Sequence, residues 1–253
     1  MIMPTHLVAT VILLYRKGIS EENLLRKIMW LGMACLQRGA KLSDSGLPDS
    51  TTMKIGLKHL NDYIIKKRDI LMPKVKYGDN QLVDYSSYTM LNYYRNPLNF
   101  VFFNESLVVC SLFSFGVDKV WKQGIAVEEL FMRTCFLANI IKREEVLSKS
   151  ISAKNRDAFD ETIAFMVAQR LMVVKKDEAG VDRINLKSSG EASMLLIGSI
   201  CWPLIDTYYI VTLFALSLVK RKDVNEAKFS LDVQWLAETM FQEGKINYFE
   251  SCN

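Results

Sequence analysis

The chain has 253 residues, of which 50% are hydrophobic and 24% are charged. This composition excludes an intrinsically disordered chain, and the length suits one large domain or two small ones. The formal net charge is +4, and the basic residues are spread along the chain, which argues against a nucleic-acid-binding protein.

The first element expected from the sequence is a buried apolar segment that ends at Gly18. Its apolar run, Leu7 to Tyr15, superficially resembles a signal peptide, but the basic leader and the small-residue cleavage site are both missing. Ser20 then supplies a good N-cap for a helix whose apolar positions begin at Leu24. Residues 41–52 contain the glycine, proline, serine and aspartate typical of an exposed loop.

The next segments predict a helix followed by a hairpin, and this order occurs twice. Residues 53–71 have apolar side chains at helical spacing, and Gly78-Asp79-Asn80 lies between alternating segments. Later in the chain, a helix capped near Asp157 or Asp160 precedes a second hairpin around Glu178-Ala179-Gly180. A long apolar helix is expected after each hairpin.

The two long apolar helices, at residues 96–115 and 192–219, complete the predicted architecture. The fold class expected is mainly α with small β-hairpins (α+β), arranged as two units of helix, hairpin and buried helix. A helix followed by a two-stranded wing is also how winged-helix modules begin, an analogy at the level of the fold alone. The predicted division is a first unit at residues 1–150 and a second unit with the tail at 151–253, or one continuous domain.

Charged residues within the first long apolar stretch require a structural explanation. Asn96 and Pro97 form an N-cap and N1 pair, so a helix is expected to begin there, with Arg95 just before it. Glu105 falls on an apolar face of that helix, where an unpaired charge is costly. Arg95 is therefore the predicted structural partner of Glu105, and an arginine from elsewhere in a larger assembly is the alternative.

The second long apolar stretch is long enough to span a bilayer, yet Pro203 and Asp206 lie near its centre. A spanning helix would bury that carboxylate in lipid, whereas a core helix can pair it with a basic residue. We therefore expect a buried helix with a paired Asp206, and peripheral contact with membrane lipid stays open. The basic run Lys220-Arg221-Lys222 that follows meets either solvent or acidic lipid headgroups.

The search for catalytic chemistry is short because the chain has two histidines, His6 and His59. Neither lies in a His-x4-Asp pattern, and His59 with Asp62 is interpreted as a surface pair on a helix. No nucleophile motif and no glycine-rich phosphate loop is present in the sequence. The five cysteines are widely spaced without a CxxC pair, which indicates reduced thiols in an intracellular compartment. We assign no catalytic, cofactor-binding or metal-binding residue.

Four fragments distributed over most of the chain carry a resemblance to known proteins. In chain order they are MPTHLVATVILLYRKGIS, LNYYRNPLNFVFFNESLVV, CWPLIDTYYIV and EGKINYFES. Together, in this order, they resemble the carboxyl-terminal half of the glycerol-3-phosphate and dihydroxyacetone-phosphate acyltransferase family. The resemblance implies a part in phospholipid biosynthesis.

The chain departs from that family in ways that limit what the resemblance implies. In the family, a catalytic domain carries a His-x4-Asp motif, whose acid orients the general base, with a Gly/Arg motif and a Glu-Gly-Thr-Arg-like motif for phosphate. None of these motifs occurs in the present sequence. A histidine often follows Tyr-Tyr-Arg-Asn in the family, where Asn99 and Phe100 stand here. The catalytic motifs are expected upstream of Met1, and both ends of the chain are expected to be cut.

Two functions remain open at this point. In the first, the chain is the non-catalytic accessory part of an sn-1 glycerol-3-phosphate or dihydroxyacetone-phosphate acyltransferase and packs on a catalytic part. In the second, it is a catalytically inactive scaffold subunit of a larger membrane-associated, mitochondrial complex. The partners expected are an acyltransferase catalytic domain or other protein subunits, with peripheral membrane lipid and without nucleic acid or a cofactor. The location expected is intracellular and membrane-associated, in the mitochondrion rather than the peroxisome or endoplasmic reticulum.

Overall fold

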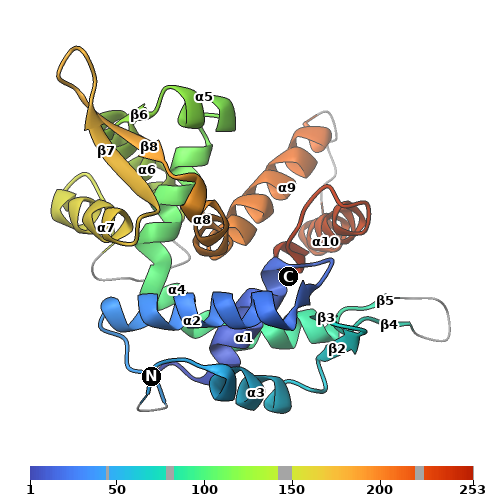
Figure 1. Ribbon diagram of the computed structural model, residues 1–253. Coiled ribbons are helices and arrows are strands. Elements are labelled where there is room, and N and C mark those ends of the chain that lie inside the picture. Colours follow the sequence, from blue (N-terminus) through green and yellow to red (C-terminus); the bar gives the residue numbers. More distant parts are fainter. Residues whose placement is uncertain (44–45, 78–82, 142–149, 220–224, 253) are drawn as a thin grey trace. The chain divides into compact units, whose positions relative to one another are not determined.

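The computed structural model describes residues 1–43, 46–77, 83–141, 150–219 and 225–252. Helix accounts for 65% of the structure (Figure 1). Two three-stranded antiparallel sheets and one two-stranded ribbon lie within the described residues. The mainly helical fold with small β-hairpins predicted from the sequence is therefore confirmed.

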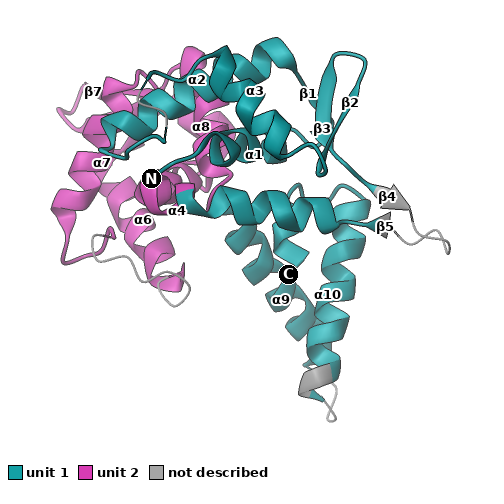
Figure 2. Ribbon diagram, turned by 90° about the horizontal axis from the view of Figure 1, so that it is seen from below, with its two compact units in different colours: residues 1–97, 202–253 teal, residues 98–201 magenta. Residues whose placement is uncertain are grey.

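The chain forms two compact units, shown in different colours in Figure 2. Unit 1 comprises Met1–Pro97 and Trp202–Asn253, and unit 2 comprises Leu98–Cys201. These bounds differ from the predicted segments, 1–150 and 151–253, because the carboxyl-terminal helices pack with the amino-terminal part of the chain.

The first ninety-seven residues begin with a complete winged-helix topology. The elements run α1 (Pro4–Leu14), β1 (Ile19–Ser20), α2 (Glu21–Gln37), α3 (Ser50–His59), β2 (Ile64–Lys67) and β3 (Ile70–Pro73). The sheet order is β1-β3-β2, and both pairings are antiparallel. We refer to residues 4–73 as the first module. The winged-helix analogy drawn from the sequence thus extends to the strand order.

Local sequence explains how the first module forms. Helix α1, in which nine of eleven residues are buried, is the core against which α2, α3 and β3 pack. The Ser20 side chain caps α2 by accepting the Asn23 backbone N–H, and Asp49 caps α3 in the same way. Gly18 has φ +95°, and a Cβ there would lie 3.1 Å from the Leu71 carbonyl oxygen. Only glycine accepts this backbone without strain.

The helix predicted over residues 53–71 is wrong in its second half. Helix α3 ends at His59, and residues 64–73 form the β2–β3 hairpin instead. Isoleucines at 64, 65 and 70 favour a strand because β-branched side chains pack well on a pleated surface. Arg68, at φ +55°, makes the turn between the strands. Apolar spacing over a short segment does not separate these alternatives.

The hairpin predicted around Gly78 is described only at its base. Strands β4 (Lys76–Tyr77) and β5 (Val83–Asp84) pair antiparallel, with Lys76 opposite Asp84. The predicted turn residues Gly78-Asp79-Asn80 lie outside the described residues.

Helix α4 (Ser86–Phe113) corrects the predicted role of Asn96. The helix begins ten residues earlier than expected, so Asn96 is an internal residue and no cap. Pro97 lies inside the helix, and Phe102 leaves helical geometry at φ −120° and ψ 18°. An internal proline costs about 3 kcal/mol, but packing of neighbouring apolar residues can offset that cost. Leu91, Leu98 and Phe102 are fully buried, so the helix continues through the proline.

Unit 2 contains a second winged-helix topology. Its elements are α5 (Val117–Lys122), β6 (Ile125–Ala126), α6 (Val127–Ile141), α7 (Arg156–Ala168), β7 (Met172–Lys176) and β8 (Asp182–Leu186). The sheet order is β6-β8-β7, again antiparallel. We refer to residues 117–186 as the second module. The predicted hairpin around Glu178-Ala179-Gly180 is confirmed, whereas the cap of α7 is Asn155 and neither Asp157 nor Asp160.

The predicted continuous helix over residues 192–219 is broken. After η1 (Ser188–Gly190) come α8 (Glu191–Gly198) and α9 (Trp202–Leu218), with a break between them. In unit 2, the Ser106 hydroxyl donates to the Gly198 carbonyl and accepts the Cys201 backbone N–H. These bonds satisfy backbone groups that a broken helix leaves free.

Membrane-spanning length is not reached by any single apolar helix among the described residues. The segments Ser188–Gly198 and Trp202–Leu218 reach it only as a pair separated by the break. Helix α10 (Glu226–Gln242) and η2 (Phe249–Cys252) complete the chain and pack with α9 in unit 1.

Candidate functional site: a buried cluster of charged and aromatic residues in unit 1

A buried ion pair joins two distant parts of unit 1. Arg95 of α4 and Glu250 of η2 are separated by 2.9 Å between Nη1 and Oε1. Their side chains are 4% and 5% exposed, so water screens their attraction very little. Removing one partner of such a pair typically costs about 3–5 kcal/mol, because the other charge is left uncompensated. This pair therefore ties the end of the chain to α4.

Aromatic rings pack around the same region of unit 1. Tyr85 stacks on Phe249 with ring centroids 4.5 Å apart, and both rings contact Phe241 edge-on. The Arg16 guanidinium lies 3.8 Å from the centroid of the Phe241 ring, a cation–π geometry. Arg16 also donates to the Ile246 carbonyl oxygen at 3.5 Å. We refer to these residues, with Arg95 and Glu250, as the unit 1 cluster.

Two titratable groups beside the cluster have raised pKa values. Burial raises the pKa of the Cys252 thiol to about 12, and the Glu238 and Glu250 carboxylates add to this rise. Burial also raises the pKa of Tyr88, against the opposing effect of Arg16. A thiol that stays protonated is a poor nucleophile, so Cys252 is a packing residue.

Asp206 lies on α9 in the same unit. Burial raises the pKa of its carboxyl group to about 6, and a hydrogen bond involving Trp202 partly opposes the rise. Among the described residues, no cation forms an ion pair with Asp206, and its Oδ2 atom has no hydrogen-bond partner. The basic partner expected from the sequence is therefore not found in the described part of the chain.

The four fragments that carry the sequence resemblance all contribute to this region. Arg16 comes from the first, Arg95 from the second and Glu250 from the fourth. The third joins them through Pro203, whose carbonyl oxygen accepts the Ser251 hydroxyl at 3.1 Å. Segments far apart in the sequence thus meet in one buried, structural arrangement.

The predicted pair of Arg95 and Glu105 stays a prediction. Glu105 is buried, as its position on an apolar face suggested, with 1% of its surface exposed. Sequence reasoning did not consider Glu250 as a partner of Arg95. The Tyr-Phe-Glu-Ser motif was visible as part of the resemblance, but a pairing across 155 residues leaves no periodic signal in the sequence.

Neither histidine is placed for acid–base catalysis. The fifth residue after His6 is Val11, and the fifth after His59 is Ile64, so the His-x4-Asp carboxylate is missing at both positions. His6 Nδ1 accepts the Met3 backbone N–H, and burial together with the nearby amino terminus lowers the pKa of His6. His59 is exposed at the end of α3. The described residues contain no group of three His, Cys, Asp or Glu arranged to hold a metal ion.

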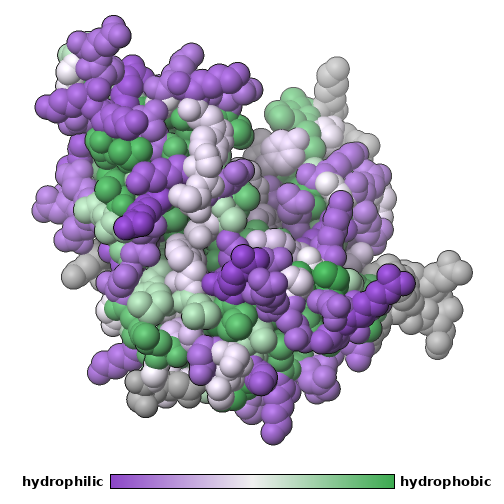
Figure 3. Space-filling view, in the orientation of Figure 1, coloured by the Kyte–Doolittle hydropathy of each residue, from purple (hydrophilic) through white to green (hydrophobic). Residues whose placement is uncertain are grey.

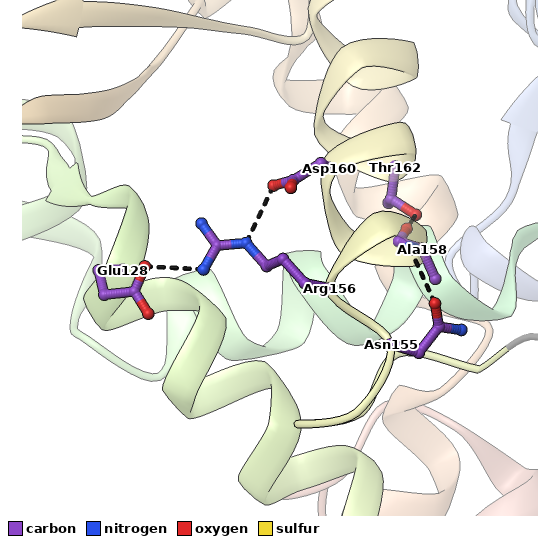
Figure 4. A network of polar contacts seen from close by, with 6 residues as sticks. All are labelled: Glu128, Asn155, Arg156, Ala158, Asp160 and Thr162. Atoms are coloured by element: carbon purple, nitrogen blue, oxygen red, sulfur yellow. Dashed lines mark hydrogen bonds and ion pairs between the residues drawn. The ribbon is translucent and has the colours of Figure 1, made fainter.

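A polar network in unit 2 fixes α6 to α7. Figure 4 shows the Arg156 side chain reaching between Glu128 of α6 and Asp160 of α7. The two contacts are 2.7 Å and 3.1 Å, and the guanidinium also lies 4.3 Å from the Phe131 ring centroid. All three charged side chains are substantially exposed, so this network joins the two helices at the surface and contributes little to stability.

An open groove lies beside α6 in unit 2. Its volume is about 350 Å³, and it is lined by Phe115, Glu129, Met132, Arg133 and Phe136. Lys119 and Arg133 both lie over the Phe115 ring, and Lys119 also pairs with Glu129 at 3.5 Å. The cations are thus already engaged by an aromatic face and an acid. The groove is thus lined by apolar side chains and by charged groups that already contact one another or an aromatic ring.

One family model matches the sequence over its whole length. It is described as the glycerol-3-phosphate acyltransferase C-terminal region, and it covers residues 1–253. No curated protein matches the chain.

Proposed function

The chain belongs to the glycerol-3-phosphate acyltransferase C-terminal family, and from this membership we propose that it is the non-catalytic accessory part of an sn-1 glycerol-3-phosphate or dihydroxyacetone-phosphate acyltransferase. In this role it packs on a catalytic part that carries the His-x4-Asp motif, which the present sequence does not contain.

The observation that carries this proposal is the buried ion pair of Arg95 and Glu250, two charged residues from the fragments that resemble the family. Acyl transfer to a hydroxyl needs a general base near the acceptor and donors for the developing oxyanion. Arg95 and Glu250 neutralise each other away from solvent, so neither is available to a phosphate or a hydroxyl group. Both histidines lack the acid that would orient them. The described residues therefore favour an accessory role beside a catalytic part over a catalytic role.

Exposed apolar helix faces supply surfaces for the catalytic part. In unit 1, Met29, Met33 and Leu36 recur at helical spacing along α2 and are exposed. Figure 3 shows hydrophobic residues among hydrophilic ones along α2. In unit 2, Met132 and Phe136 are exposed on one face of α6. Methionine-rich and aromatic faces of this kind are enriched in protein interfaces.

The proposal also includes an intracellular, membrane-associated location. All five cysteines are free thiols, which suits a reducing compartment. The preference for the mitochondrion over the peroxisome or endoplasmic reticulum rests on the family resemblance alone.

A reconstitution assay tests the proposed function. Acyl-CoA-dependent acylation of glycerol-3-phosphate is measured for the purified chain alone, for a separately expressed catalytic part bearing His-x4-Asp, and for their mixture. We expect no turnover by the chain alone, and a stable complex in the mixture. Phe136→Ser should weaken the complex, whereas Val181→Ser, at an exposed apolar residue of the second wing, should not.

Two results would contradict this assignment. Turnover by the chain alone that is abolished by His6→Ala or His59→Ala would show a catalytic site of its own. Failure to bind the catalytic part, together with a stable complex with unrelated subunits, would favour the inactive scaffold subunit instead.

A further inference from the structure

One face of α9 is unusually apolar for a helix surface exposed to solvent. From Thr207 to Val219 the sequence contains no charged residue. Tyr209, Leu213 and Leu216 are nevertheless 55%, 41% and 65% exposed. Their spacing of four and three residues places them on one side of the helix. Water therefore meets a continuous apolar stripe on α9.

This stripe points away from the neighbouring helix of unit 1. Phe214 lies on the other side of α9 and contacts Phe229 of α10, with ring centroids 5.4 Å apart. The side of α9 that packs in unit 1 is thus occupied. The stripe of Tyr209, Leu213 and Leu216 has no covering element in the described part of unit 1, as its exposure shows.

Helix α10 provides an internal reference for this surface. It also exposes two large apolar residues, Leu231 and Trp235, each 67% exposed. Lys228 and Glu238 share that side of α10, at positions three residues before and after the two apolar ones. Such mixing of charge with isolated apolar residues is ordinary on a solvated helix. The exposed side of α9 lacks this mixing.

Three consecutive cationic residues follow α9 in the sequence. Lys220, Arg221 and Lys222 follow Val219 directly. An apolar helical face with tyrosine, followed in the sequence by consecutive cations, is the composition of helices that lie in the interface of a membrane with acidic lipids. A bilayer of acidic lipids offers phosphates to cations in any arrangement, whereas a protein partner would need carboxylates placed to meet them. The charge therefore favours lipid over a protein surface.

We propose that the exposed stripe of α9 is a membrane-docking surface that lies parallel to an anionic lipid bilayer. Tyr209, Leu213 and Leu216 insert between headgroups and the outer part of the acyl chains. This proposal rests on the membrane association proposed above, and it identifies the face that makes the contact. Docking in the interface also agrees with α9 being too short to span a bilayer by itself.

Vesicle sedimentation tests the docking face. The 253-residue chain is mixed with vesicles of phosphatidylcholine, with or without phosphatidylglycerol, and the bound fraction is measured. We expect binding that increases with phosphatidylglycerol and decreases with salt. The double variant Leu213→Asn/Leu216→Asn should bind about tenfold more weakly, because two leucine side chains no longer leave water.

Leu231→Asn is the matched control, because Leu231 of α10 is 67% exposed and Leu216 is 65% exposed. This variant should bind vesicles like the wild type. Neither exposed leucine holds the fold together, and equal thermal melts of all variants would establish this. Replacing Lys220, Arg221 and Lys222 with glutamine should remove the dependence on phosphatidylglycerol.

Three outcomes would overturn the assignment. Equal binding by the α9 and α10 variants would show that the membrane contact lies elsewhere in the chain. No binding by the wild type to either vesicle would refute the membrane association itself. Loss of binding to an acyltransferase catalytic part in the α9 variant, with vesicle binding unchanged, would show that a protein covers this face. None of these results depends on acyl transfer, so the accessory function is tested independently.

Discussion

The first and second modules share a topology but not a charge. Both run helix, strand, helix, helix, strand, strand, and in both the third strand lies between the other two. A glycine with positive φ precedes the first strand in each, Gly18 at +95° and Gly124 at +67°. In each case the carbonyl of the central strand lies close behind that glycine, from Leu71 or Ile184.

The charges differ in the segment that contains the third helix and the wing. Residues 50–73 of the first module contain five basic and two acidic residues, a net charge of +3. Residues 156–186 of the second module contain five basic and six acidic residues, a net charge of −1. The same fold forms on both. Topology in these modules therefore depends on apolar positions and glycines, and the surface charge can differ without changing it.

The largest expected effect is a difference in unfolding free energy between breaking a buried ion pair and breaking an exposed one. Glu250→Gln should destabilise unit 1 by about 3–5 kcal/mol, because the buried Arg95 guanidinium loses the charge of this carboxylate. Arg156→Met in the second module should cost under about 1 kcal/mol, because its ion pairs are exposed. Urea unfolding of each variant measures both values.

Double-mutant cycles identify the partner of Arg95. Combining Arg95→Met with Glu250→Gln should recover part of the loss, since both charges of this pair are then removed together. The same cycle with Glu105→Gln tests the pair predicted from the sequence. If the losses add independently in the Glu250 cycle, this ion pair does not stabilise the fold.

The shared glycines provide the next largest effect. Gly124→Ala should destabilise the protein by about 1–3 kcal/mol, because the backbone has positive φ and the new Cβ would lie 2.9 Å from the Ile184 carbonyl oxygen. Gly18→Ala should cost at least as much, because its new Cβ would clash with Cγ2 of the β-branched Ile70 and lie 3.1 Å from the Leu71 carbonyl oxygen. Gly180→Ala, with a similar φ and open space, is the control. An equal loss for all three in thermal melts would mean that strain in φ acts alone.

Removing the Asp206 carboxyl group should have a smaller effect on the stability of unit 1, and that effect should depend on pH. Its pKa is about 6 in the folded chain against 3.8 for a free side chain, so the folded state holds the proton longer. This contribution to stability is present below about pH 4 and is lost as pH rises towards 6. Asp206→Asn should therefore stabilise the protein by about 1 kcal/mol at pH 7, after allowance for solvent screening, and have no effect at pH 3.5. A gain that is equal at both pH values would contradict the titration of Asp206.

The smallest expected difference is in amide exchange between the two wings, the hairpins β2–β3 and β7–β8. In the second module, the Asp177 carboxylate accepts Arg183 Nε at 2.7 Å and the backbone N–H groups of Ala179 and Val181. In the first module, the hairpin residue Lys66 pairs with Glu21 of α2, and the described residues show no comparable carboxylate bonded to the β2–β3 turn. Asp177→Asn should speed amide exchange at the β7–β8 turn, while Lys66→Gln should leave exchange of the β2–β3 hairpin nearly unchanged. Equal changes would show that the turn network contributes nothing beyond one ion pair.

Local pattern was sufficient for several parts of this protein. Ser20 marks the start of α2, and the Glu178-Ala179-Gly180 turn marks the second wing, because caps and turns are decided by residues a few positions apart. The mainly helical class and the burial of most residues from Leu98 to Leu112 follow from apolar content and spacing, although Phe100 is 68% exposed. The family resemblance, carried by four short fragments, agrees with the family match.

Tertiary structure decided what local pattern could not. Leu60, Ile64 and Leu71 fit a helix by spacing, but Ile64 and Leu71 lie in strands because β3 pairs with both β1 and β2. Pro97 should end a helix, yet burial of Leu91 and Leu98 outweighs its cost. Arg95 finds Glu250 across 155 residues, because a buried charge takes the partner that folding brings near it, wherever that partner lies in the sequence.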